Sequence, residues 1–337
     1  MSTYTLIPIH QSALYKCQTK KKLEKLLTLE EGQLRFIAEA IKYKHFQIDK
    51  KNTTEKRQIT APTYTLKSIQ KRILQLIQRI ERPEWVISGR KGKSYIDNGR
   101  FHQNCKYALT IDITKFYENC HREYVFCFFR DKLKTSSDVA EILTDITILD
   151  KMIPTGCPTS QLLAYFAYEE MFSEINAVAI KHGCKFSLYV DDMTFSSDIP
   201  FDPQKLQRAV ELVLRRYGHK LKKGKTRFYS KGVSKHITGA IVTPDNEITV
   251  PNSLRRRVYE GFQEIKEGKC EDQIEFAGKL HTLQGRLQAS KNLEVGIFSE
   301  ITRLTKRISD QCGAASTVKS TQKKKSKRKK IVIKKNV

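Results

Sequence analysis

Long hydrophobic runs, acidic residues and metal-binding cysteine patterns are all scarce in this sequence of 337 residues. No uninterrupted apolar stretch is long enough to span a bilayer, and the N-terminus lacks the charged segment followed by a hydrophobic one that a secretory signal needs. The eight cysteines include no CxxC pair and no cluster with histidine at zinc spacing. These absences argue against a membrane-spanning protein and a structural zinc module, and they predict a cytoplasmic protein with reduced cysteines.

The deficit of acidic residues leaves the chain strongly cationic. It has 36 Asp and Glu against 62 Lys and Arg, which gives a formal net charge of +26. So large an excess favours a polyanionic partner, nucleic acid above all, although charge can also serve solubility alone. The cations gather in three places: Lys220 to Lys235, Arg255 to Arg257, and beyond Lys319. This clustering favours nucleic acid over solubility.

The pattern of apolar residues divides the chain into four parts. Residues 1–54 predict an N-terminal helical element, with helices that flank a turn near Gly32 and extend to about residue 45. Residues 55–250 alternate predicted strands and helices, and a stretch rich in Gly, polar and basic residues at 88–104 predicts a loop. Residues 251–312 predict a helical lobe. Residues 313–337 predict a flexible basic tail, with ten Lys or Arg between Lys319 and Lys335.

Three aspartates in the central part stand at the ends of predicted strands. Asp112 follows the apolar run that starts at Tyr107, and Asp191 and Asp192 lie at a tight turn between two β-rich runs. Phosphoryl transfer with two metal ions needs carboxylates that two adjacent strands can supply. Buried acids without such a role are costly, but an Asp-Asp pair by itself is also compatible with a solvated turn.

Three motifs in this region resemble those of reverse transcriptases. The segment Tyr189 to Asp192 resembles the YxDD box, Ile111 to Tyr117 resembles the first catalytic motif, and Ile153 to Ser160 resembles the Pro-x-Gly-x-x-x-Ser segment. The resemblance covers roughly residues 55–300. It implies an α+β right-hand polymerase with fingers, palm and a small helical thumb, and it implies RNA-directed DNA polymerase activity.

The same resemblance assigns roles to single residues. Two Mg²⁺ ions would be held by Asp112, the backbone carbonyl of Ile113, Asp191 and the auxiliary Asp192. The incoming nucleotide would be contacted by Arg57 at the triphosphate, Tyr117 as a steric gate, Thr155, Gly156, and Lys225 at the departing pyrophosphate. Core packing is the alternative for Tyr117, and an exposed salt bridge is the alternative for Arg57. Many relatives carry Gln where this chain has Thr155, which leaves the role of Thr155 open.

Two further motifs resemble retron reverse transcriptases of bacteria. Asn98-Gly99-Arg100-Phe101-His102 is close to Asn-Ala-x-x-His, and Ile237-Thr238-Gly239 is close to Val-Thr-Gly. The resemblance implies that the enzyme uses dNTPs, takes a cognate structured non-coding RNA as template and primer, and makes branched DNA. It also implies an accessory effector protein and a role in antiphage defence. Asn98, His102 and the run Arg255-Arg256-Arg257 would contact the RNA.

Three alternatives remain beside the retron enzyme. A non-retron defence or group II intron-like reverse transcriptase would share the polymerase motifs but prime differently. An RNA-binding scaffold with a vestigial polymerase site belongs to another functional class, and the intact Asp112, Asp191 and Asp192 argue against it. A metal-dependent nucleotidyl cyclase could use a similar palm, but the segment around Gly156 and the basic helical lobe favour a long nucleic acid.

Overall fold

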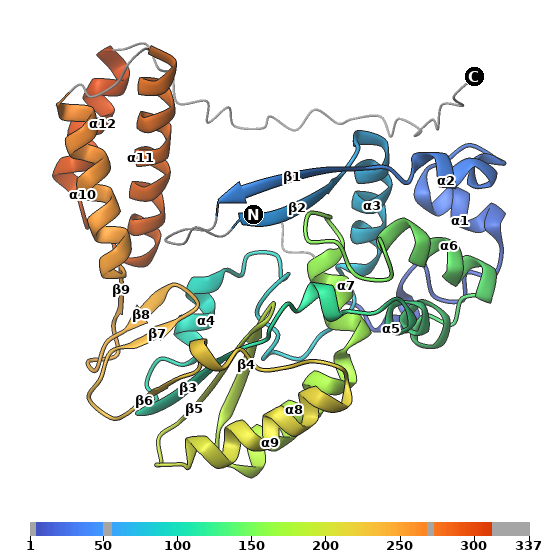
Figure 1. Ribbon diagram of the computed structural model, residues 1–337, viewed down its shortest axis with the longest axis horizontal. Coiled ribbons are helices and arrows are strands. Elements are labelled where there is room, and N and C mark those ends of the chain that lie inside the picture. Colours follow the sequence, from blue (N-terminus) through green and yellow to red (C-terminus); the bar gives the residue numbers. More distant parts are fainter. Residues whose placement is uncertain (1–4, 50–55, 268–272, 312–337) are drawn as a thin grey trace.

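The computed structural model describes residues 5–49, 56–267 and 273–311. In the N-terminal part, strands β1 (Tyr43–Asp49) and β2 (Lys56–Pro62) form an antiparallel hairpin that extends from α3 (Tyr64–Ile77) toward the side of the C-terminal helices (Figure 1). The elements before the hairpin are η1 (Ile9–Gln11), α1 (Lys20–Leu27), η2 (Gln33–Phe36) and α2 (Ile37–Ala40). The helical segment expected to reach residue 45 therefore ends at Ala40. Pairing of residues 43–49 with β2, which lies later in the chain, overrides the local helical pattern.

The central sheet is antiparallel, with the strand order β4-β5-β3-β6. Its strands are β3 (Tyr107–Asp112), β4 (Lys185–Tyr189), β5 (Asp192–Ser197) and β6 (Arg227–Tyr229). Side chains alternate between two faces, as strand geometry requires. One face carries the buried apolar residues Leu109, Ile111, Phe186, Leu188, Met193 and Phe195. The other face carries polar residues at the paired positions, namely Thr110, Asp112, Ser187, Asp192, Thr194 and Ser196.

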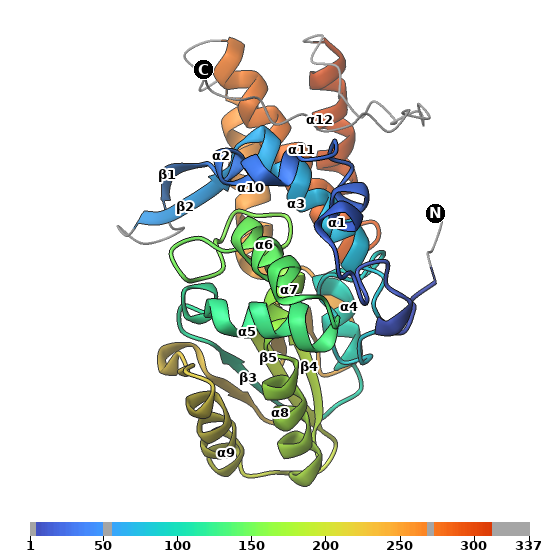
Figure 2. The same cartoon turned by 90° about the vertical axis from the view of Figure 1, so that its right-hand side faces the viewer.

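Helices cover the apolar face and continue the same core. Helices α8 (Glu169–Lys181) and α9 (Pro203–Arg216) lie along the sheet on the side away from α4 (Tyr95–Phe101) (Figures 1 and 2). Between β3 and α8 the chain forms α5 (Arg122–Cys127), the π-helical turn η4 (Phe128–Lys132), α6 (Ser137–Thr147) and α7 (Ser160–Ala167). The sheet, these helices and α3 bury their apolar side chains in one continuous cluster. Burial of this apolar area is the main stabilising contribution to the fold.

Helix α4 lies inside the segment predicted to be a loop. Its N-cap is Ser94, whose Oγ accepts from the backbone N–H of Ile96 at 3.2 Å, while the carboxylate of Asp97 accepts from the N–H of Ser94 at 2.8 Å. This reciprocal arrangement is a capping box. The loop prediction is wrong, because the capping box of Ser94 and Asp97 and the contacts of α4 with β8 (Ala240–Val242) and β9 (Ile248–Thr249) stabilise a helix despite the Gly-rich and basic composition.

A second small sheet and a group of three helices complete the described chain. The sheet has the strand order β7 (Lys235–Ile237), β8 (Ala240–Val242) and β9 (Ile248–Thr249), and α4 contacts β8 and β9. Helices α10 (Asn252–Lys266), α11 (Gln273–Leu293) and α12 (Ser299–Gln311) stand beside it with their own apolar cluster around Val258 and Leu283 (Figure 1). The α+β class expected from the sequence is confirmed.

No helix within residues 5–49, 56–267 and 273–311 combines the length and the apolar character that crossing a membrane requires. The basic tail expected at residues 313–337 lies outside the described residues.

Candidate active site

Three aspartates meet at one end of the central sheet. Asp112 is the last residue of β3 and lies directly opposite Asp192, the first residue of β5. Asp191 precedes Asp192 in the two-residue turn from β4, where Val190 has a φ of 63°. A β-branched residue in the left-handed region is strained, and the N–H of Val190 donates to Ser88 Oγ at 3.0 Å, which holds the turn in place. The structure thus brings together the three acids that the motifs single out.

The charges of these acids make the strand end attractive to a cation. Burial, followed by the charges of Asp191 and Asp112, raises the pKa of Asp192 to about 7, while the nearby Lys225 opposes the rise. Asp112 is 8% exposed, and its carboxylate accepts a hydrogen bond from Lys225 Nζ at 2.7 Å. This bond raises the pKa of Lys225. The backbone places Lys225 here, because the N–H of Lys222 donates to the carbonyl of Asp112 at 2.8 Å.

The donor set fits a hard divalent cation, although it does not form a closed cage. Within the described part of the chain, no three Asp, Glu, His or Cys side chains converge closely enough to hold a metal ion by themselves. Mg²⁺ commonly takes one or two carboxylates and completes its coordination with water and substrate phosphates. Ile113 forms an antiparallel bridge with Leu221 that uses the carbonyl of Asp112 and the N–H of Thr114. The carbonyl of Ile113 takes no part in that bridge.

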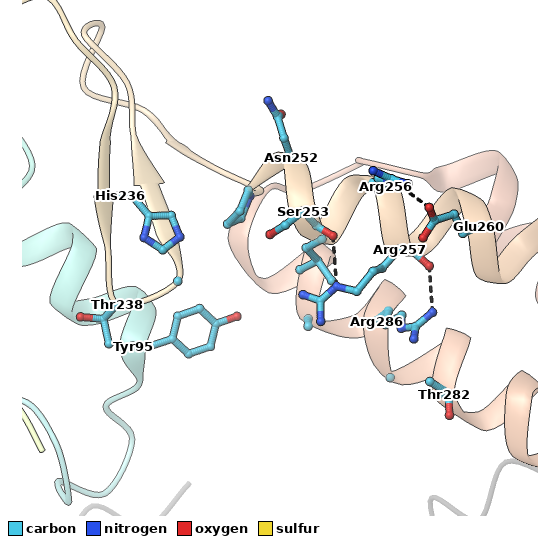
Figure 3. Close-up of a pocket in the computed structure, with 15 residues that line it drawn as sticks. Tyr95, His236, Thr238, Asn252, Ser253, Arg256, Arg257, Glu260, Thr282 and Arg286 are labelled. Carbon is cyan, nitrogen blue, oxygen red and sulfur yellow. Dashed lines mark hydrogen bonds and ion pairs between the residues drawn. The ribbon is translucent and has the colours of Figure 1, made fainter. Parts of the chain in front are cut away.

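Two neighbouring cavities share part of their lining, and the carboxylates line the smaller one. The first, of about 370 Å³, is lined by Asp112, Asp192, Lys225 and Arg227 among others. The second is a cleft of about 1540 Å³ between the second small sheet and the helices α10 and α11 (Figure 3). His236, Thr238 and Gly239 line both cavities. An extended ligand could therefore pass from the cleft to the acids along the β7–β8 turn.

The residues expected to contact the nucleotide are only partly gathered at this site. Lys225 lines the smaller cavity, whereas Tyr117, Thr155 and Gly156 are absent from the described residues that line either cavity. The half-buried ring of Tyr117 packs beside Phe116, with ring centroids 5.5 Å apart. Arg57 belongs to β2, where its backbone pairs with Ile48, and its side chain lies outside the described structure.

Gly156 has a packing role that the motif did not predict. A Cβ at this position would collide with the carbonyl oxygen of Thr60 and lie 3.0 Å from the carbonyl carbon of the same residue. The segment Ile153 to Ser160 therefore packs directly against β2 at Gly156, and only glycine allows so close an approach. Ser160 Oγ closes the same loop by donating to the carbonyl of Pro154 at 2.5 Å.

The residues expected to contact RNA divide into buried and accessible ones. Asn98 and His102 are both 0% exposed, so the expectation of a direct RNA contact disagrees with the structure. Arg255 Nη2 donates to the carboxylate of Glu294 at 2.7 Å, and Arg255 Nε donates to the carbonyl of Val250 at 3.0 Å. These bonds tie α10 to the end of α11. Arg256 and Arg257 line the cleft, as expected for residues that contact a polyanion (Figure 3).

The cleft also contains residues that the motifs did not single out. Tyr95 and His236 face the helices across the cleft, and Thr282 and Arg286 extend from α11 (Figure 3). Arg286 Nη1 donates to the carbonyl of Arg257 at 2.9 Å, which fixes its guanidinium beside α10. Tyr95 and His236 lie just before the two short motifs in the sequence, whereas no motif surrounds Thr282 or Arg286. Their shared location follows only from the packing of distant segments.

Comparison with known proteins agrees with this geometry. The family model for reverse transcriptase (RNA-dependent DNA polymerase) matches residues 48–276. The Retron Se72 reverse transcriptase of Salmonella heidelberg (strain 579083-10) is 27% identical over 195 residues, covering 57% of this chain and 51% of that protein. The Retron Ec83 reverse transcriptase of Escherichia coli is 24% identical over 300 residues, covering 84% of this chain and 91% of that protein. The chain thus spans about half the length of the first relative and most of the second.

A solved structure supports the fold. The structure of telomerase from Candida albicans in complex with a fragment of telomeric RNA superposes with a TM-score of 0.50 at 11% identity, and the match covers 81% of this chain and 55% of that one. At this identity the likeness concerns the fold alone, which is that of a right-hand polymerase. With its family match over residues 48–276 and the three aspartates joined at one strand end, the chain belongs to the reverse transcriptase family, and the relatives described above are retron enzymes of bacteria.

Proposed function

We propose that this protein is the RNA-directed DNA polymerase of a bacterial retron, which copies part of a cognate structured non-coding RNA into branched single-stranded DNA. The observation that carries the proposal is the position of the acids. Asp112 and Asp192 pair in register, Asp191 adjoins them, and the cavity beside them shares lining residues with a large cleft that three arginines also line. A polymerase needs this combination of a metal-binding strand end and a path for a long polyanion.

The proposed reaction requires divalent cations, which the family implies. Two Mg²⁺ ions bound by Asp112, the carbonyl of Ile113 and Asp191, with Asp192 as an auxiliary acid, would activate the 3′-hydroxyl and neutralise the leaving pyrophosphate. Lys225 lies just before β6, at the same end of the sheet, and donates at 2.7 Å to Asp112. In the working enzyme we expect Lys225 to turn from Asp112 to the phosphates of the incoming dNTP, because a metal ion would take over its neutralising role.

Other residues would position the substrates. Arg256, Arg257 and Arg286 would hold the phosphates of the RNA–DNA duplex in the cleft, since guanidinium groups bind phosphates with paired donors. Tyr117 and Thr155 are absent from the described lining of the two cavities. Their contact with the nucleotide would therefore require the segments that carry them to move toward it, and Arg57 would contact the triphosphate from β2. An accessory effector protein and a role in antiphage defence complete the proposal by similarity to retron enzymes.

The test replaces the carboxylates and measures synthesis and binding separately. Asp191→Asn combined with Asp192→Asn should abolish DNA synthesis on a primed RNA, because metal ligation is lost. RNA affinity should remain close to that of the wild type, because the arginines of the cleft are untouched. Asp198→Asn, at an exposed acid outside the site, is the matched control and should remain active. Measurable synthesis by the double variant would contradict the catalytic assignment.

The nucleic acids that co-purify with the wild type test the retron part of the proposal. Sequencing should find one structured RNA joined to DNA through a branched guanosine 2′-hydroxyl. DNA without a branch, or with diverse RNA templates, would favour the non-retron reverse transcriptase. RNA without any DNA product would favour the scaffold.

A further inference from the structure

Two fully buried side chains connect α4 to the strands that carry the acids. The ring of His102 lies 2.7 Å from Ser187 Oγ on β4 through Nε2 and 2.6 Å from Ser196 Oγ on β5 through Nδ1. Ser187 is four residues before Asp191, and Ser196 is four residues after Asp192. His102 therefore bridges the two strands of the hairpin whose turn contains Asp191.

The donors and acceptors of this network have one consistent order. Ser187 Oγ donates to Asn98 Oδ1 at 2.6 Å, so its only hydrogen is used and it must accept from His102 Nε2. Nδ1 of His102 then accepts from Ser196. Asn98 Nδ2 donates onward to Thr238 Oγ1 at 2.7 Å. Burial lowers the pKa of His102 to about 3, which keeps the ring neutral as this order requires.

The last member of the network, Thr238, belongs to a strained turn. Ile237 pairs with Ala240, and the two residues between them have positive φ angles, 48° at Thr238 and 93° at Gly239. Two-residue hairpins favour such angles, but a β-branched residue adopts them only when neighbours hold it. The hydrogen bond from Asn98 holds Thr238. The ring of Tyr95 packs on Gly239, where a Cβ would lie 3.6 Å from the ring.

The position of this turn matters because it lies between the two cavities. Thr238 and Gly239 line both the cavity with the carboxylates and the cleft of α10 and α11. A strand that runs from the carboxylates into the cleft along these shared residues passes the turn. A shift of the turn would therefore move the strand end relative to Asp112, and misplacement of about 1 Å is enough to slow chemistry considerably.

We infer that Asn98 and His102 are positioning residues, which fix the β7–β8 turn relative to the strands of Asp191 and Asp192 and so align the 3′-terminal nucleotide of the growing strand with the carboxylates. This inference rests on the proposed function. It gives the two short motifs a common role, because the buried network joins Asn98 and His102 of the first to Thr238 of the second. The residues act through the turn and touch no substrate themselves.

Thr238 offers the sharpest test, because its hydroxyl can be removed without changing its volume. Thr238→Val loses the bond to Asn98 and retains the β-branched shape, whereas Thr238→Ser retains the hydroxyl. Thr238→Val should lower kcat about tenfold in DNA synthesis on a primed RNA, which corresponds to one lost hydrogen bond at the upper end of its usual contribution. The KM for dNTP should not change, since the turn holds the strand end and not the nucleotide. Thr238→Ser should restore most of the rate.

A double-mutant cycle connects the effect to the network. Asn98→Ala combined with Thr238→Val should be no slower than Asn98→Ala alone, because both single changes remove the same bond. If Asn98→Ala fails to fold, the kcat of Thr238→Val, compared with those of the wild type and Thr238→Ser, tests the inference without the double-mutant cycle. A variant that melts at a lower temperature but shows the wild-type kcat below its melting point would reduce the network to a structural role and overturn the inference.

The wild type separates this inference from the proposed function. If the wild type makes no DNA, the proposed function fails and the inference fails with it. If the wild type makes DNA and Thr238→Val is equally fast, only the inference fails.

Discussion

Asp192 stands at a position where its negative charge is unfavourable in the folded protein. Its pKa of about 7 is above the usual value of 3.8, because burial and the neighbouring acids disfavour ionisation. The folded protein thus holds this proton more tightly than the unfolded chain does. The stability contributed by the protonated form is full below about pH 4 and is lost as the pH rises through about 7.

Asp192→Asn should therefore stabilise the metal-free protein at alkaline pH. Asparagine cannot ionise, so the variant avoids the loss that the wild type suffers. In the presence of a chelator, its melting temperature should exceed that of the wild type by a few degrees at pH 8, and the difference should shrink as the pH falls toward 4. Thermal unfolding followed at several pH values measures this. The exposed Asp198→Asn is the control, and an equal gain at pH 4 and pH 8 would refute the electrostatic explanation.

The positions of the catalytic acids can be predicted from the sequence, because the strands that carry them have a recognisable apolar pattern. The apolar run before Asp112 and the turn at Asp191 predict acids at strand ends, and the resemblance to the reverse transcriptase motifs favours a shared metal site over a solvated turn. The burial of Asn98 and His102 could not be predicted, because a short motif does not reveal whether its polar side chains face solvent or pair inside the protein. The close approach of Gly156 to Thr60 is equally invisible in the sequence, since it joins two segments about a hundred residues apart in the chain.

At the scale of elements, α10 contributes neighbouring arginines with different roles. Arg255 bonds to Glu294 and to the carbonyl of Val250 and so connects α10, α11 and the segment after β9. Arg256 is exposed in the cleft and pairs only with Glu260, one turn along its own helix, among the described residues. Exposed pairs of this kind contribute little to stability. These different roles could not be predicted from the run of three arginines. Successive residues of a helix point in directions about 100° apart, so neighbours in the sequence meet different surroundings.

Replacement of each arginine should separate these roles. Arg255→Ala should lower the unfolding free energy by about 1 to 3 kcal/mol, because Glu294 and the carbonyl of Val250 lose a partly buried charged partner. Arg256→Ala should leave stability nearly unchanged but weaken binding to an RNA–DNA duplex, with a log-log salt slope smaller by roughly 0.7 to 0.9. Chemical denaturation and binding at several salt concentrations measure the two effects. The reverse pattern would show that Arg255 is the residue that contacts nucleic acid.

The element order is largely predictable from the sequence, and the exceptions share a cause. Helix α4 is hidden by a Gly-rich and basic composition, and β1 is hidden by a helical pattern. Both are stabilised by partners distant in sequence: α4 by β8 and β9, and β1 by β2. Local patterns predict elements that stabilise themselves, such as α3 and α9, better than elements that depend on tertiary partners.

For the whole molecule, the net charge of +26 is concentrated in a few segments of the sequence, of which the C-terminal tail is the densest. Deletion of residues 313–337 removes ten Lys or Arg. The deletion should weaken RNA binding and reduce its salt dependence by roughly 0.7 to 0.9 in slope for each phosphate that the shortened chain no longer neutralises. Synthesis on a short, saturating primer–template should persist, because the carboxylates and the cleft remain. Binding titrations from low to high salt measure the slope. An unchanged slope would mean that the tail is solvated or binds a protein.

The pairing of Asp112 with Asp192 also limits how the gene can change. Because side chains alternate along a strand, a one-residue insertion in β3 or β5 would turn Asp112 or Asp192 into the apolar core and bring Ile111 or Met193 to the surface of the site. The chain would lose its core and its carboxylates in one step. We therefore expect natural length variation among related genes to fall in the connecting segments. An alignment of such genes should contain no gaps within β3 and β5.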